Sequence, residues 1–168
     1  MGIFSLANTK EAFVRVKRWF LGWLHLGPHF VVGDPNDPYL LRWYILPRNP
    51  WLNVYVHKFV KDDDDRALHD HPWKSLSILL FGRYREIAKD GATKDYGPLS
   101  VVRREAEHAH RIELPKDAKT GKSKPAWTLF FTGSVRREWG FHCKEGWRHW
   151  KEYTAPGLPG QVGKGCDD

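Results

Sequence analysis

The sequence has little cysteine and no long apolar run. Only two cysteines occur among its 168 residues, Cys143 and Cys166, and the second lies in a segment rich in glycine. We therefore expect no disulfide, and this cysteine usage is typical of the reducing cytoplasm. No stretch approaches the roughly 20 consecutive apolar residues that a helix needs to cross a bilayer. The sequence thus predicts a cytoplasmic protein without a membrane segment.

A concentrated basic patch is also lacking. The formal net charge is +7, but the basic residues are spread along the chain and the acidic run 62–65 interrupts them. A positive chain attracts nucleic acid through phosphate contacts, yet no known nucleic-acid-binding motif accompanies the charge here. We therefore expect a small-molecule ligand as the partner, and neither nucleic acid nor a membrane.

Aromatic residues, in contrast, are abundant. They make up 14% of the chain and include nine tryptophans, which favours strands and provides material for one packed core. Near the N-terminus, Phe13, Val16 and Phe20 recur at spacings of three and four. This pattern predicts an amphipathic helix that follows an N-cap at Thr9 and ends before residue 27.

Short apolar runs separated by turn residues occupy most of the remaining chain. They predict strands at residues 39–46, 53–61, 75–81, 83–88, 99–103, 109–114, 127–132 and 138–143. Strands at this density, with no helical periods between them, predict an all-β fold, an antiparallel barrel or sandwich. We expect a helical segment over residues 1–28, one β-barrel domain over 29–154 and a flexible tail over 155–168.

Histidines carry the strongest chemical signal. His69 and His71 are two residues apart, and residues two apart on a strand project to the same face, so both imidazoles can reach one metal ion. Asp70, between them, points the opposite way and is better placed to fix a neighbouring loop. Neutral imidazole suits Zn, Fe, Ni, Cu and, less well, Mn, so the spacing alone does not name the metal.

A family resemblance rests on these residues. His69-x-His71, followed by Gly82 after a spacer, resembles the first sequence motif of the cupin superfamily, and the later segment around His110 resembles the second. Similarity to a group of uncharacterised cupin-like proteins of bacteria and their phages covers the runs 69–73, 82–86, 110–114, 127–133 and 139–141. The resemblance implies a cupin-type antiparallel β-barrel (an RmlC-like jelly roll) in which His110 completes a divalent metal site. Cupins are frequently dimers, which leaves a homodimer open.

Two departures from the cupin pattern bear on that site. Ser75 stands where the family has a glutamate ligand, and Leu114 where it usually has asparagine. Without the glutamate, neutral imidazoles leave the double charge of the metal uncompensated and favour an anionic ligand or substrate. Such three-histidine sites are similar to those of cupin oxygenases, and Fe(II) is the metal we expect, with Zn, Ni and Mn as alternatives. The other interpretation of Ser75 is a site that no longer holds metal tightly.

Further side chains are candidates for proton transfer and substrate contact. His108 shares a predicted face with His110; the family motif favours His110 as the ligand and leaves His108 at the rim, against substrate. Glu86 and Tyr84 share a face after the first motif and could transfer protons, as could His57 on a neighbouring strand. The alternatives are an exposed, ion-paired strand for the first two and a hydrogen-bonded core histidine for His57.

Arg136 and Arg137 complete the set of candidates. Guanidinium groups match carboxylates and phosphates, so this pair could bind an anionic substrate, although such pairs also occur in solvated turns. We expect a metal-binding cupin, with a metal-dependent oxygenase acting on a small anionic molecule as the first hypothesis. The alternatives are a non-catalytic module of phage or prophage origin that binds a small molecule or sugar, and a metal-independent sugar-nucleotide epimerase.

Overall fold

The computed structural model describes residues 6–24, 27–63, 67–155 and 163–166. Two helices and twelve strands lie in this part of the chain. In chain order they are α1 (Leu6–Leu24), β1 (Phe30–Asp34), β2 (Asp37–Tyr44), β3 (Asn53–Phe59), β4 (Leu68–His69), β5 (Ser75–Phe81), β6 (Tyr84–Ala88), β7 (Thr93–Tyr96), β8 (Val101–Arg104), β9 (His110–Glu113), β10 (Ala126–Thr132), β11 (Gly140–Cys143), β12 (Gly146–His149) and α2 (Trp150–Tyr153).

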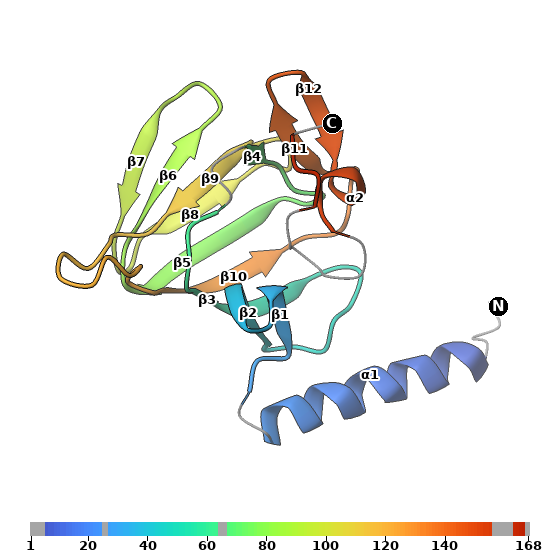
Figure 1. The fold of residues 1–168 in the computed structure, drawn as a ribbon. Helices are drawn as coiled ribbons and strands as arrows, with labels where there is room; N and C mark the ends of the chain where they lie inside the picture. Colours follow the sequence, from blue (N-terminus) through green and yellow to red (C-terminus); the bar gives the residue numbers. More distant parts are fainter. Residues whose placement is uncertain (1–5, 25–26, 64–66, 156–162, 167–168) are drawn as a thin grey trace.

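The strands form two six-stranded sheets (Figure 1). One has the order β1-β2-β3-β10-β5-β8 and the other β12-β11-β4-β9-β6-β7. Neighbouring strands are antiparallel in both sheets. This arrangement confirms the predicted all-β jelly roll with an N-terminal helix.

The space between the sheets is filled by alternate residues of the inner strands, as strand geometry requires. Its apolar part is a cluster contributed by both sheets, consisting of Leu40, Phe59, Leu79, Tyr84, Ile112, Leu114 and Ala126. The same alternation also buries a second, polar set: His57, Ser75, Ser77, Glu86, Arg104, His110, Thr128 and Thr132. Burying polar groups is costly unless they are bonded, so this polar region is where a functional site is expected.

Helix α1 lies outside the barrel and is tied to it by two tryptophans (Figure 1). The indole Nε1 groups of Trp19 and Trp23 both donate to the Tyr44 carbonyl, at 2.7 and 3.1 Å, and His29 Nε2 lies 2.9 Å from the Trp19 carbonyl. The helix was predicted, but it begins at Leu6, so the expectation that Thr9 is its N-cap is wrong. Within the described residues, no helix is long and apolar enough to cross a bilayer.

All eight predicted strands are present, with ends shifted by up to two residues, and four further strands were missed. Three of the four, β1, β7 and β12, are edge strands. Edge strands need only one partner and carry fewer buried apolar residues, so their periodicity is weak. In β1, a register shift next to Gly33, whose φ is 96°, interrupts the alternation further.

The expectation that the cysteines are unpaired is wrong. Cys143, at the end of β11, forms a disulfide with Cys166. The backbone amides of Gly163 and Gly165 donate to the Tyr153 carbonyl at 3.0 and 3.1 Å, so residues 163–166 fold back against α2 instead of fraying. Residues 156–162 and 167–168 of the predicted tail lie outside the described residues. The disulfide removes the sequence argument for a reducing compartment.

Candidate metal centre

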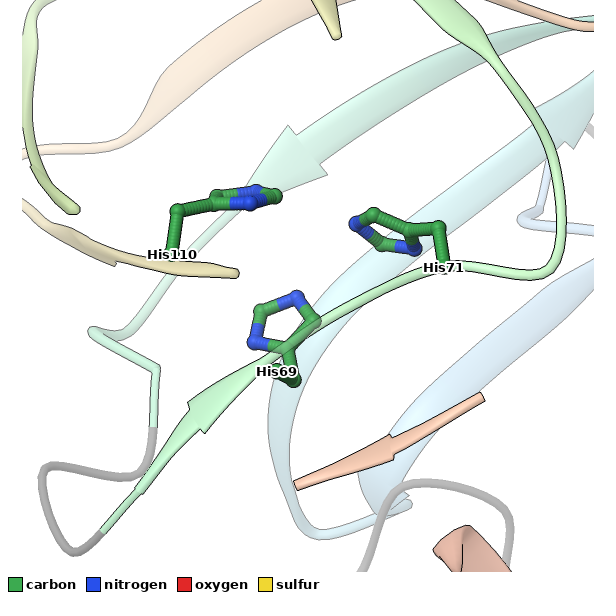
Figure 2. Close-up of side chains that lie close together, drawn as sticks. All are labelled: His69, His71 and His110. Carbon is green, nitrogen blue, oxygen red and sulfur yellow. The ribbon is translucent and has the colours of Figure 1, made fainter. Parts of the chain in front are cut away.

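Three histidines converge between the two sheets. His69 ends β4, His71 follows two residues later, and His110 begins β9, where it is the register partner of His69. Their ligand nitrogens all lie within 4.8 Å of one another, and Figure 2 shows the three imidazoles pointing toward a common space. The structure thus brings together the three residues that the sequence motifs predicted as metal ligands.

Hydrogen bonding fixes which nitrogen of His110 is available. His110 Nδ1 lies 3.0 Å from the His108 carbonyl, which can only accept, so Nδ1 carries the proton and Nε2 keeps its lone pair. His69 Nδ1 lies 3.9 Å from Asp63 Oδ2, and Asp63 is itself held by the Ile112 amide at 2.6 Å. A carboxylate near one imidazole nitrogen favours a metal ligand at the other.

The electrostatic environment keeps two of the imidazoles neutral. Burial lowers the pKa of both His71 and His110 well below its ordinary value, with the nearby His69 as the next cause and Arg104 after it. Neutral imidazole is the form that binds a metal ion. The donor set therefore fits a borderline divalent ion such as Fe(II), Zn or Ni, and Mn less well, with coordination positions left for other ligands.

Ser75, in the position of the family glutamate, does not replace the missing anionic ligand. It is buried at the start of β5, and its hydroxyl has no hydrogen-bond partner among the described residues. No carboxylate oxygen in the described part of the chain belongs to the cluster of ligand atoms. The centre consists of imidazoles alone, as expected from the sequence.

Glu86, Tyr84 and His108 lie in one polar network around Arg104. Arg104 Nε donates to Glu86 Oε2 at 2.8 Å, its Nη2 contacts the same oxygen, and Nη2 also donates to the Tyr84 hydroxyl at 3.3 Å. His108 Nε2 lies 2.9 Å from Glu86 Oε1. Because the Glu86 carboxylate accepts from Arg104, His108 donates to it from Nε2. Its ring stacks on that of His110, with centroids 5.3 Å apart.

This network has consequences for Tyr84. Burial raises the pKa of Tyr84, an effect that Arg104 partly opposes, so the phenol remains protonated at neutral pH. The side chains of Tyr84 and Glu86 point inward, whereas Arg85 between them forms a two-bond ion pair with Asp95 of β7 on the outer face. The cross-strand pair and the buried cluster therefore exist together, on opposite faces of β6.

His57 lies elsewhere in the interior. Arg42 Nε donates to His57 Nε2 at 2.8 Å, and the imidazole stacks on Phe130 with centroids 4.8 Å apart. Burial, followed by the charge of Arg42, lowers the pKa of His57 well below its ordinary value. The imidazole is thus neutral, and its accepting nitrogen is already occupied. His57 is therefore a hydrogen-bonded core histidine, the alternative that the sequence left open.

The two candidate arginines occupy different environments. Arg136 is exposed, whereas Arg137 Nη1 pairs with Asp70 Oδ2 at 2.9 Å. Asp70 is 1% exposed and also accepts from the Gly140 amide at 2.8 Å, while the side-chain nitrogens of His142 and Trp147 lie 3.1 Å away. The predicted role of Asp70 in fixing a neighbouring segment is confirmed, and that segment is the β11–β12 hairpin.

Two residues of the centre were not anticipated. Asp63 belongs to the acidic run that interrupts the basic residues, and it is buried behind His69. Arg104 ends β8, where the alternation with Val102 placed it on the inner face, but an inward arginine needs a partner that only the opposite sheet supplies. The sequence signal that could have identified Arg104 was its position on the inward face of a strand, where a charged residue is unusual.

Comparison with known proteins agrees with the fold. No protein-family model and no curated protein sequence matches the chain. The cupin-2 domain protein Rru_A2000 of Rhodospirillum rubrum is similar in structure, with a TM-score of 0.53 and 12% identity over 70% of this chain and 76% of that chain. A cupin superfamily protein of Desulfitobacterium hafniense has a TM-score of 0.44 and 17% identity, over 62% of this chain and 84% of that chain. A conserved protein of Klebsiella pneumoniae with a double-stranded β-helix domain has a TM-score of 0.47 and 12% identity, over 65% and 89%. The two-sheet arrangement and the likeness to the Rhodospirillum rubrum protein show that this chain has a cupin-type jelly-roll fold.

Proposed function

We propose that the protein is a metal-dependent cupin enzyme, with oxygenation of a small anionic molecule as its reaction. The observation that carries the proposal is the convergence of three imidazoles from two paired strand segments. His69, His71 and His110 would hold the ion, with Fe(II) as the first candidate. When bound, a metal of this kind supplies a Lewis-acid or redox centre with open positions for substrate.

The charge balance of the site supports an anionic substrate. Three neutral imidazoles would leave the charge of a divalent ion uncompensated. Glu86, a buried carboxylate near the ligands, is already neutralised by Arg104. Asp63 faces His69 from behind at 3.9 Å and is held by a backbone amide. An anionic group on the substrate would therefore provide the balance.

We assign proton transfer to His108. Its side chain is 37% exposed, its Nε2 is fixed by Glu86, and its Nδ1 has no hydrogen-bond partner among the described residues. A neutral imidazole oriented by a carboxylate can accept a proton at the other nitrogen. Glu86 acts through His108, and Tyr84 acts through Arg104, so both are positioning residues. His57 plays no part in this assignment because Arg42 occupies its accepting nitrogen.

Metal analysis tests the proposal. Untagged protein is supplied with Fe(II) without oxygen, desalted and analysed by mass spectrometry, beside a His69→Ala/His71→Ala double variant and a His149→Ala control. His149 pairs with exposed Glu138 and lies outside the centre. We expect one iron per chain in the wild type and in the control, and loss of iron in the double variant. A wild-type protein that keeps no metal contradicts the proposal.

A further inference from the structure

A cavity separate from the histidine cluster lies where α1 meets the barrel. Its volume is about 620 Å³, which is the size of a small-molecule site. Helix α1 supplies one wall, and the other walls come from the C-terminal end of β2, the β2–β3 loop, the start of β3 and the segment after β10. The cavity is therefore bounded by the helix on one side and by one end of a sheet on the other.

The walls of this cavity carry positive charge without a counter-charge. Arg15 and Arg18 come from α1, Arg48 comes from the β2–β3 loop, and no described lining residue is acidic. No ion pair to these three guanidinium groups occurs among the described residues, and Arg48 only lies over the Tyr44 ring at 6.0 Å. Guanidinium groups gathered in a concave site attract an anion and bind it through paired N–H donors.

Aromatic side chains form a further part of the wall, and one of them contacts a histidine of the metal centre. Trp19, Tyr55 and Trp73 all line the cavity. The Trp73 ring also stacks on His71, with centroids 6.2 Å apart and planes 20° apart. A ligand in the cavity would therefore lie next to a ring that contacts a predicted metal ligand.

We propose that this cavity binds a phosphomonoester of nucleotide size, with the phosphate between Arg15, Arg18 and Arg48 and the organic part along the aromatic wall. A carboxylate is satisfied by a single guanidinium fork, whereas a phosphate dianion offers more acceptor oxygens and more charge, and so suits several forks. The inference goes beyond the proposed function, because this phosphate would lie among the arginines and not at the metal. Binding in the cavity requires no metal.

Titration calorimetry in the presence of a chelator tests binding alone, with AMP, adenosine and inorganic phosphate as probes. We expect AMP to bind and adenosine to bind at least about 10-fold more weakly, since each charge-assisted hydrogen bond contributes that much or more. Arg18→Ala and Arg48→Ala are each expected to weaken AMP binding by about 10-fold or more, with circular dichroism showing that both variants are folded. Arg103→Ala, at an exposed position of β8, is the matched control and keeps wild-type affinity.

Three results overturn the inference. The first is equal binding of AMP and adenosine, and the second is no AMP binding at millimolar concentration. The third is tight binding of a single-stranded oligonucleotide that AMP does not displace, which would identify an extended nucleic-acid surface. Because the calorimetry is made with chelator present, its result can be interpreted even if the protein binds no metal. Loss of phosphate binding in turn leaves the metal content of the protein unaffected, so the two proposals fail separately.

Discussion

Replacing Asp70 by asparagine perturbs the link between the metal segment and the β11–β12 hairpin. Asp70 Oδ1 accepts from the Gly140 amide, and Oδ2 faces Arg137 at 2.9 Å and the nitrogens of His142 and Trp147 at 3.1 Å. An asparagine oxygen can keep the bond from Gly140. Its NH₂ group would then face three nitrogens, and Arg137 would lose its counter-charge.

Breaking a buried ion pair from one side costs roughly 3–5 kcal/mol. Arg137 is 29% exposed, so water compensates part of the loss, and we expect Asp70→Asn to lower the free energy of unfolding by about 3 kcal/mol. Urea unfolding followed by tryptophan fluorescence measures the change. Asp95→Asn is the control, because its pair with Arg85 is exposed and such pairs contribute about 1 kcal/mol or less. If both variants show the same small decrease in the free energy of unfolding, the Asp70 network does not stabilise the hairpin.

Three further outcomes are expected. The Cys143→Ser/Cys166→Ser variant should have a free energy of unfolding about 3 kcal/mol lower than the wild type, the loop-closure value for a separation of 23 residues. A reductant should lower the stability of the wild type in urea by the same amount, and insensitivity to reductant would contradict the disulfide. Gly82→Ala should lower the free energy of unfolding by about 1 kcal/mol or more, and with it the melting temperature. The reason is that φ is 80° and a Cβ would lie 2.4 Å from the Pro125 carbonyl oxygen; an unchanged melting temperature would refute this. Backbone amides of residues 120 and 119 lower the pKa of Asp117. The Asp117 carboxylate therefore stabilises its loop above the unfolded-state pKa, and this stabilisation is lost as the pH falls through the folded-state pKa. An NMR titration that gives Asp117 an ordinary pKa would contradict this expectation.

The barrel and the histidine cluster could be predicted because both depend on local periodicity. A spacing of two fixes which side chains share a face, whatever the rest of the fold does. His69 and His71 therefore follow from the sequence once an extended segment is assumed, although β4 itself ends at His69. The family motifs supplied His110, whose strand pairs with β4 as that resemblance implies.

Contacts that depend on register between distant strands could not be predicted. The contact between His57 and Arg42, its register partner on β2, is known only when β2 and β3 are aligned, so the sequence left both interpretations of His57 open. Glu86 and Arg104 belong to different sheets, so no local pattern pairs them.

The disulfide escaped prediction for a related reason. Cys143 and Cys166 are 23 residues apart, with a segment rich in glycine and proline between them. Nothing in that segment indicates that it turns back toward β11. The closure depends on α2, a single turn whose Tyr153 carbonyl accepts the amides of Gly163 and Gly165.

The central claim is that three imidazoles share one metal ion, and anomalous diffraction from crystals of the iron-loaded protein tests it most directly. We expect one strong peak between the rings, bonded to nitrogens of His69, His71 and His110, with His110 bound through Nε2 because Nδ1 faces the His108 carbonyl. No protein carboxylate should reach the ion. A peak elsewhere, or one bonded to fewer than three of these histidines, would show that the three imidazoles do not share an ion.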